Sequence, residues 1–251
     1  MSMPMITLDN VTVTYNRHPA VHHVSGCFEP GSLTAIAGSN GAGKSTLLKA
    51  MMGELSSVEG TIDRGDLLVR DFGYLPQAAD IDRHFPLSVA DTVMLGAWRE
   101  VGAFGGATRA VVDRARQALV AVGLAGFEKR DIGSLSVGQF QRVLFARLLL
   151  QDAKVIILDE PFTAIDARTT HDLLAIIRRW HQEARTVIAV LHDFDQVRAY
   201  FPQTLLLARK VIGWGPTEEV LTKENLLHAK AMTEDWDDQA GVCEAPVLEG
   251  S

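Results

Sequence analysis

The sequence predicts an α/β fold with a mainly parallel sheet, an N-terminal antiparallel β portion and an inserted helical subdomain. From residue 153 to residue 208, strand-like runs alternate with helical patterns, which is typical of a parallel sheet. The opening strand-like runs follow one another without a helix between them, and this indicates antiparallel pairing. Residues 80–150 contain helical patterns and no convincing strand, so we interpret them as the inserted subdomain.

The elements follow from apolar runs and helical periodicity. Strand-like runs cover 5–14, 24–29, 33–37, 155–158, 186–191, 204–208 and 211–214. Helical patterns cover 44–52, 88–97, 109–122, 139–151, 167–183 and 216–221, and Ser88 and Asp193 are predicted to begin helices. We predict one domain over 1–230, with the helical subdomain at about 80–150, and an acidic, mobile tail over 231–251.

Composition narrows the class of protein. Of 251 residues, 47% are hydrophobic and 22% are charged, as in ordinary soluble globular proteins. The net charge of −7, without a dense basic stretch, argues against a nucleic-acid partner. No apolar run approaches the roughly 20 residues of a membrane helix, and the N-terminus lacks the pattern of a secretory signal. Cys27 and Cys243 form no CxxC pattern, so we expect a cytoplasmic protein without disulfides.

The strand-like run 33–37 leads into a glycine-rich loop and then into a helix. The loop has the pattern G-x-x-x-x-G-K-S, in which backbone N–H groups and a helix N-terminus can surround phosphate oxygens. Lys44 would place its charge on the outer phosphates, and the Ser45 hydroxyl is the expected Mg²⁺ ligand. The predicted nucleotide-binding residues here are Gly38, Ser39, Asn40, Gly41, Ala42, Gly43, Lys44, Ser45 and Thr46. The loop predicts ATP or GTP binding but leaves the reaction open, since kinases, GTPases and motors share it.

A second acidic site follows the apolar run 155–158. Asp159 would hold Mg²⁺, and Glu160 would orient the attacking water and remove its proton. A carboxylate directly after the magnesium ligand suits a hydrolase, whereas a kinase must keep water out. The sequence therefore favours hydrolysis over phosphoryl transfer to a small molecule.

Six motifs in order connect the chain to a family. The stretch 135–139 (LSVGQ) resembles the LSGGQ signature of ABC ATPases, and the phosphate loop and the acidic strand end agree with it. Gln77 in GYLPQ is similar to the family's Q-loop, Asp166 in TAID to its D-loop, and His192 in LHD to its switch histidine. Tyr15 resembles the aromatic residue that stacks on adenine. The resemblance covers about residues 5–220 and implies the ABC ATPase fold around a P-loop NTPase core.

The resemblance implies roles for these residues. Ser136, Gly138 and Gln139 would face the γ-phosphate bound by the opposite subunit, so that a head-to-tail homodimer encloses two ATP molecules. Pairing with a different ABC subunit stays open. Ser136 and Gln139 also form an S-x-x-Q capping box, which alone would explain them structurally. Val137 replaces a glycine of the family pattern and keeps the backbone N–H. His192 would contact the γ-phosphate.

The cargo is suggested by the segment after Gln77. In the family Gln77 reaches Mg²⁺ and reports nucleotide state to a membrane partner, and the region after it accepts a helix of the permease. The sequence FPLSVADTV at 85–93 is similar to the corresponding segment in ATPases of zinc and manganese importers. This implies an integral-membrane permease, an extracytoplasmic solute-binding protein and a divalent metal cargo, zinc before manganese. The alternatives are a haem or siderophore importer, a non-transport soluble ABC ATPase, or a P-loop kinase, which would lack the signature and the switch histidine.

A cluster of metal-binding residue types lies near the N-terminus, at His18, His22, His23 and Cys27. Because side chains alternate along a strand, His22 and His23 are predicted to point to opposite faces and not to share an ion. We therefore expect the metal to pass through the permease without contacting this chain.

Overall fold

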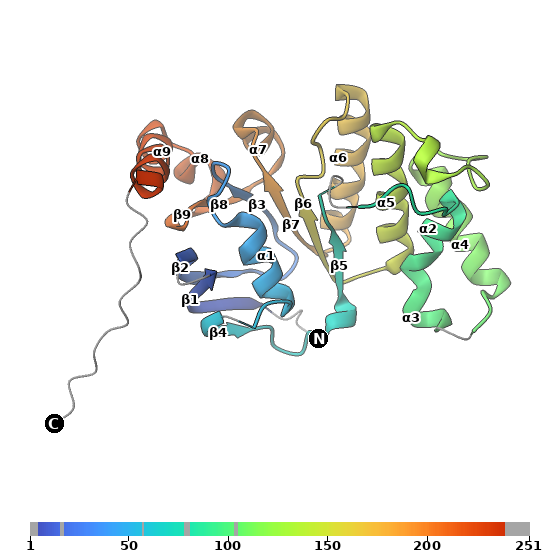
Figure 1. Cartoon of the computed structure of the whole chain (residues 1–251), viewed down its shortest axis with the longest axis horizontal. Helices are drawn as coiled ribbons and strands as arrows, with labels where there is room; N and C mark the ends of the chain where they lie inside the picture. The colour runs from blue at the N-terminus through green and yellow to red at the C-terminus, as the bar shows by residue number, and fades with distance from the viewer. Residues whose placement is uncertain (1–4, 16–17, 57, 78–80, 103–104, 239–251) are drawn as a thin grey trace. The chain divides into compact units, whose positions relative to one another are not determined.

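The computed structural model describes residues 5–15, 18–56, 58–77, 81–102 and 105–238 (Figure 1). The described chain falls into two compact units. The first contains Glu29–Thr34 and Asp66–Leu191, and the second contains Met5–Phe28, Ala35–Gly65 and the residues from His192 onward. Strand β3 (Leu33–Ala37) has its first residues in the first unit and its last residues in the second. The prediction of one domain over 1–230 stays a prediction.

Strands dominate the second unit. β1 (Ile6–Tyr15) pairs antiparallel with β2 (His18–Phe28) and with β4 (Val58–Asp63), which confirms the antiparallel portion predicted at the N-terminus. β8 (Gln203–Ala208) pairs antiparallel with β9 (Lys210–Pro216), and the end of β3 lies next to β8. The helices of this unit are α1 (Lys44–Met52), α7 (Phe194–Tyr200), α8 (Thr217–Val220) and α9 (Lys223–Asp238).

The pairing of β1 with β2 contains a bulge that corrects one prediction. Val11 pairs with Val24 and Val13 with Val21, so the register shifts between these pairs. His23 adopts a left-handed φ of 51°, and its ring lies 4.1 Å from the ring of His22. The prediction that the two side chains point to opposite faces is wrong, because the bulge interrupts strand alternation. Among the described residues, no group of three or more His, Cys, Asp or Glu side chains is arranged to hold a metal.

The first unit is built around parallel strands. β5 (Phe72–Leu75), β6 (Val155–Asp159) and β7 (Thr186–Leu191) pair in this order, and the start of β3 follows β7. Every residue of β6 and β7 is buried, as expected of strands covered on both faces. The helical elements are η1 (Val69–Asp71), α2 (Val89–Met94), η3 (Leu95–Ala97), α3 (Trp98–Val101), α4 (Arg109–Ala121), η4 (Ile132–Ser134), α5 (Val137–Gln151) and α6 (Ala167–Gln182).

Helix packing in the first unit centres on α5. In Figure 1, α5 stands between α6 and the group formed by α2 and α4, and it contacts each of them. Phe145 of α5 stacks on Trp180 of α6 with ring centroids 5.7 Å apart. The predicted helix starts at Ser88, Ser136 and Asp193 are confirmed, since each side chain accepts a hydrogen bond from a backbone N–H of the first turn.

Several elements were not predicted, among them the strands β4 and β5 and the helix α9. β4 (VEGTID) is a mostly exposed strand with a glycine in its middle, and β5 (FGYL) has only four residues. Neither offers the long apolar run or the alternation that marks a strand in sequence. α9 continues to Asp238, so part of the acidic stretch that we assigned to a tail is helical, and residues 239–251 lie outside the described residues. No helix within the described ranges is long and apolar enough to cross a bilayer.

The stacking of Phe145 on Trp180 predicts a large stability effect. Trp180 is 1% exposed, so Trp180→Ala should lower the free energy of unfolding by about 3–5 kcal/mol, measured by urea denaturation. Trp98→Ala is the matched control, because Trp98 is 55% exposed and its loss should change stability by less than about 1 kcal/mol. Equal losses in the two variants would contradict this assignment of the core.

Candidate functional site

The loop between β3 and α1 has a backbone that only glycine fits. Gly43 has a φ of 90°, and a Cβ there would lie 2.2 Å from the carbonyl oxygen of Ala20. Gly41 also has a positive φ, of 76°, but no atom lies within 4 Å of its Cβ position. Gly43 therefore allows close packing, whereas Gly41 leaves the loop surface open to a ligand.

Lys44 closes this loop. Its Nζ donates hydrogen bonds to the carbonyl oxygens of Gly38 at 2.9 Å and of Ser39 at 2.8 Å. Lys44 is only 6% exposed, so its ammonium group is held within the loop and away from bulk water. A charge in this position is ready to exchange carbonyl oxygens for phosphate oxygens.

The N-terminus of α1 has neither a side-chain cap nor an acidic residue, whereas α3 and α8, which also lack a side-chain cap, have acidic residues in their first turns. The N-cap of α1 is Gly43, which provides no side-chain hydrogen bond. Helices α2, α4, α5, α6 and α7 are each capped by a side chain, from Ser88, Thr108, Ser136, Asp166 and Asp193 respectively. An uncapped helix start presents backbone N–H groups and a positive dipole end, and both suit a phosphate group.

Two further predicted residues belong to the same unit as the loop. A cavity of about 790 Å³ is lined by Gly38, Ser39 and Asn40, by His192, and by residues of α9. The structure thus places the exposed His192 beside the start of the loop. Tyr15 is the last residue of β1, and its side chain lies outside the described part of the chain.

The acidic pair at the end of β6 belongs to the first unit. Asp159 is 2% exposed. Glu160 has a left-handed φ of 50°, an uncommon and costly conformation for a residue other than glycine. Its backbone N–H donates to the carbonyl oxygen of Val190 at 3.2 Å, and its carboxylate accepts from the Thr163 hydroxyl at 3.2 Å. The turn at Glu160 therefore fixes the carboxylate immediately after the strand.

The first unit also brings several predicted residues around one cavity. This cavity has a volume of about 640 Å³, and Gln77, Val137 and Glu160 contribute to its lining. The Q-loop residue, the signature segment and the proposed base are therefore neighbours in one unit, although Gln77 and Glu160 are 83 positions apart in the sequence.

The signature segment forms the start of α5. The Ser136 hydroxyl accepts from the Gln139 N–H at 3.2 Å, and the Gln139 side chain accepts from the Ser136 N–H at 3.1 Å. The predicted capping box is confirmed. A Cβ on Gly138 would lie 3.6 Å from the carboxylate of Asp166, so the D-loop residue lies against the signature.

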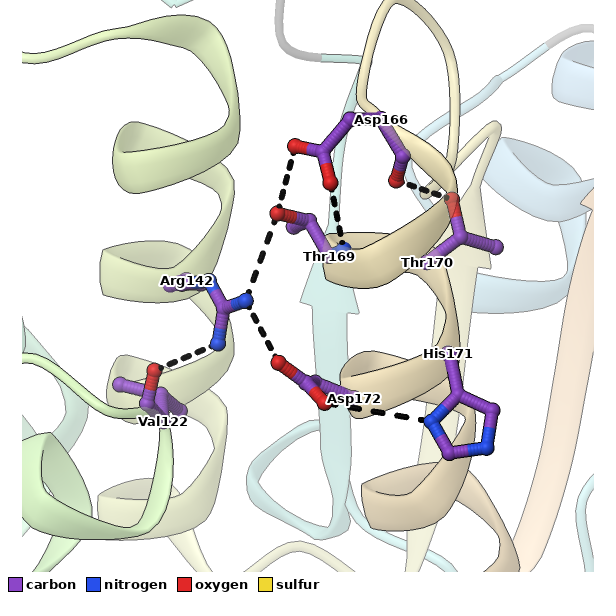
Figure 2. A network of polar contacts seen from close by, with 7 residues as sticks. All are labelled: Val122, Arg142, Asp166, Thr169, Thr170, His171 and Asp172. Atoms are coloured by element: carbon purple, nitrogen blue, oxygen red, sulfur yellow. Dashed lines mark hydrogen bonds and ion pairs between the residues drawn. The ribbon is translucent and has the colours of Figure 1, made fainter.

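A polar network connects α5 to the first turns of α6 (Figure 2). Arg142 donates to the carbonyl oxygen of Val122 at 2.9 Å, to the Thr169 hydroxyl at 3.3 Å and to the carboxylate of Asp172 at 2.7 Å. Thr169 in turn donates to Asp166 through its backbone N–H and its hydroxyl. The signature helix and the D-loop residue are therefore joined through two intervening side chains.

Two carboxyl groups of this network titrate at lower pH than usual. Hydrogen bonds from the backbone and side chain of Thr169 lower the pKa of Asp166 below its ordinary value of 3.8. The hydrogen bond from Arg142 lowers the pKa of Asp172 in the same direction. Both carboxylates are therefore ionised at neutral pH and hold the start of α6.

The sequence analysis missed some residues that support the site. Gln141 is 2% exposed and donates through its side-chain amide to the carbonyl oxygen of Pro161 at 2.8 Å. Gln141 and Arg142 are adjacent polar residues within an otherwise apolar stretch of α5. Polar residues within an apolar stretch of a helix are expected to be buried, and a buried polar side chain needs a hydrogen-bond partner. Their position in the sequence could therefore have marked them as residues that connect α5 to its neighbours.

The site residues are divided between the two units. The second unit holds Tyr15, the loop residues 38–46 and His192. The first unit holds Gln77, Ser136, Gly138, Gln139, Asp159, Glu160 and Asp166. A buried strand, a loop closed by a lysine and an uncapped helix define the class of P-loop nucleotide-binding proteins.

The comparisons with known proteins define the family. A family model described as ABC transporter matches residues 21–163, and the chain belongs to this family. It is an ATPase that couples hydrolysis to transport.

Curated relatives cover most of the chain. The manganese transport system ATP-binding protein MntB of Bacillus subtilis is 39% identical, and the match covers 88% of this chain and 90% of the relative. The zinc transport system ATP-binding protein TroB of Treponema pallidum is 36% identical, and the match covers 89% of this chain and 86% of the relative.

Solved structures agree with the fold. One is an ABC transporter described as of the metal-chelate type, in an inward-facing conformation. It is 30% identical with a TM-score of 0.79, and the match covers 90% of this chain and 89% of that one. A bacterial ABC transporter cassette, MJ0796, solved as a dimer, is 27% identical with a TM-score of 0.74. The match covers 84% of this chain and 98% of that one.

The Arg142 network predicts a dependence of stability on acid. Because the pKa of Asp172 is lower in the folded than in the unfolded chain, its contribution is full above the unfolded pKa and is lost as pH falls through the folded one. Between about pH 5 and pH 3, Asp172→Asn should therefore lose less unfolding free energy than the parent chain. Asp113→Asn is the control, since Asp113 forms an exposed pair with Arg116 at 3.6 Å. Parallel curves for the parent and Asp172→Asn would contradict this role.

Proposed function

We propose that this chain is the ATP-hydrolysing motor subunit of an ABC importer for a divalent transition metal. The observation that carries the motor assignment is the loop closed by Lys44 at the uncapped start of α1. The loop combines a positive charge with a helix start that has no side-chain cap, and this is what the β- and γ-phosphates of ATP require.

The residues of the site fit Mg²⁺ as the metal of ATP. Ser45, Gln77 and Asp159 would hold it, and all three offer the hard oxygen ligands that Mg²⁺ prefers. When bound, Mg²⁺ neutralises charge that develops on the phosphate oxygens. The position of Asp159 supports this role, because it is the last residue of β6 and directly precedes the proposed base Glu160.

The remaining residues perform the hydrolysis. Lys44 gives up loop carbonyls to bind the outer phosphates, and His192 donates a hydrogen bond to the γ-phosphate. Glu160 accepts the proton of the attacking water at its carboxylate, which the Thr163 hydroxyl orients at 3.2 Å. Tyr15 stacks on the adenine ring.

The working unit is a head-to-tail homodimer that forms with ATP. Ser136, Gly138 and Gln139 would meet the γ-phosphate bound by the partner subunit, and Asp166 would support them. The first turn of α5 contains no acidic residue, which favours an anion at this helix end. The dimeric cassette MJ0796 supports this assembly, and a heterodimer with another ABC subunit is the alternative.

The motor would work on an integral-membrane permease at the cytoplasmic face of the membrane. Phe85 is 60% exposed, and Leu95 and Trp98 are also exposed, so the segment after the Q-loop offers apolar side chains to a partner. An extracytoplasmic solute-binding protein would deliver the cargo to the permease. With its net charge of −7, the chain is not expected to bind nucleic acid.

The relatives support a metal as the cargo. Two of the proteins reported above are named for manganese and zinc transport, and they match this chain over nearly its whole length. The ATP site itself does not encode cargo, because the family shares it. Uptake measurements with both metals decide between zinc and manganese.

Substitution of the proposed base gives the sharpest test of the motor. Glu160→Gln should bind ATP with unchanged affinity, hydrolyse it about 10²–10⁴-fold more slowly and accumulate as an ATP-bound dimer in sedimentation. Adding Ser136→Arg to Glu160→Gln should preserve ATP binding and abolish the dimer, because a bulky cation fills the place of the partner's phosphate. Turnover near the wild-type rate in Glu160→Gln would remove this residue from the base role.

Metal accumulation tests the cargo. Cells lacking this chain, with no redundant importer, should accumulate less zinc or less manganese and recover when the missing metal is added in excess. The wild-type chain should restore uptake, and Lys44→Ala should not, because the outer phosphates lose their charge partner. Normal accumulation of both metals in the deletion strain would overturn the metal assignment and leave the ATPase assignment in place.

A further inference from the structure

The segment that follows the Q-loop is hydrogen-bonded to the segment that precedes the signature. The Ile132 N–H donates to the carbonyl oxygen of Leu87 at 3.0 Å, and the Val89 N–H donates to that of Arg130 at 2.8 Å. Ser88 forms an isolated β-bridge with Asp131 between these two contacts. The chain near the exposed Phe85 and the chain entering the signature therefore run side by side within the first unit.

Arg83 adds a side-chain connection to this backbone pairing. Its Nη2 donates to the carbonyl oxygen of Ile132 at 3.3 Å and to that of Leu135. Its guanidinium carbon lies 4.9 Å from the centre of the Phe140 ring, a cation–π distance. Leu135 directly precedes Ser136, and Phe140 directly follows Gln139, so Arg83 contacts both sides of the capping box.

The chemistry of these contacts suits a holding role. A guanidinium group is a planar, permanently charged donor, and one side chain can therefore fix two carbonyl groups and cover an aromatic ring. The carbonyls belong to η4 and its C-terminal cap, the turn that aims the chain into α5. Without Arg83 these two carbonyls lose their side-chain donor, and the turn that leads into Ser136 is held by fewer contacts.

One donor of Arg83 has no acceptor among the residues that the structure describes. Its Nε is buried and makes no hydrogen bond to any described residue. A buried donor without an acceptor is costly, so the contacts that Arg83 makes through its other donor and through the Phe140 ring must offset that cost.

We propose that Arg83 is a positioning residue that couples the permease-facing segment after the Q-loop to the signature motif. It holds Ser136–Gln139 in the geometry that closes on the partner's ATP, and displacement of the segment around Phe85 shifts that geometry. The proposal rests on the proposed function, since it assumes that the signature acts in an ATP-bound dimer.

The test measures dimerisation in the Glu160→Gln background. Adding Arg83→Gln should weaken the ATP-dependent dimer by about tenfold in sedimentation, as expected for the loss of charge-assisted hydrogen bonds. The ATP affinity of the monomer should stay unchanged, because the side-chain hydrogen bonds of Arg83 are to Ile132 and Leu135 and not to the phosphate loop 38–46. Arg130→Gln is the matched control, because it removes a cation–π contact with Phe127, 3.9 Å from the ring centre, in the same unit.

A conservative variant and a double-mutant cycle separate positioning from general stability. Arg83→Lys keeps a cation and a donor, and it should restore much of the dimer. Ser136→Ala and Arg83→Gln should be non-additive, with the double variant weaker than the worse single one by no more than about twofold.

Several results would overturn the proposal. These are an unchanged dimer in Arg83→Gln, equal weakening by Arg130→Gln, additive effects with Ser136→Ala, or a parallel loss of monomer ATP affinity. Failure of the proposed function is distinct, because Glu160→Gln alone would then form no ATP-dependent dimer.

Discussion

The backbone N–H groups at the first turns of the helices are the constraint on which this site depends. Every α-helix begins with N–H groups that have no partner inside the helix. In α6, Asp166 satisfies them with its carboxylate, and in α5 Ser136 and Gln139 do so reciprocally. In α1, Gly43 cannot. Lys44 lies at this same point, with its charge held on loop carbonyls. The start of α1 therefore suits a polyanion for two reasons: it lacks a capping side chain and an acidic residue, and it has a lysine.

A second requirement is that the signature helix keep its position relative to its neighbours in the first unit. Gln141 joins it to Pro161, just beyond the acidic strand end, and Arg142 joins it to Asp172 on α6. Arg83, which precedes α5 in the sequence, holds the turn before the same helix start by a hydrogen bond to the carbonyl oxygen of Ile132. Because these contacts come from buried or partly buried donors, moving the helix start means exchanging several hydrogen bonds together, which favours a small number of discrete positions.

Much of the fold could be predicted because its signals are local. The strands β3, β6 and β7 are continuous apolar runs, and the caps Ser88, Ser136 and Asp193 stand directly before helical periodicity. β4 and β5 escaped prediction because they are short or exposed, and their pairing is supplied by partners distant in sequence.

The candidate site likewise contains residues that a local sequence pattern reveals and residues that it does not. Motif residues such as Lys44 are recognisable from spacing, whereas Arg83 and Arg142 have no local pattern, since long side chains find partners only after the chain has folded. The orientation of His22 and His23 was mispredicted because one residue of the bulge takes a left-handed conformation, which no alternation rule anticipates.

The left-handed backbone of Glu160 has a consequence for how this chain changes under selection. A non-glycine residue in such a conformation costs on the order of 1–3 kcal/mol, and glycine would relieve most of that strain. A screen that rewards only thermal resistance would therefore enrich Glu160→Gly, while a screen that rewards growth on scarce nutrient would keep the glutamate. At this single position, selection for stability favours glycine and selection for ATP turnover favours glutamate.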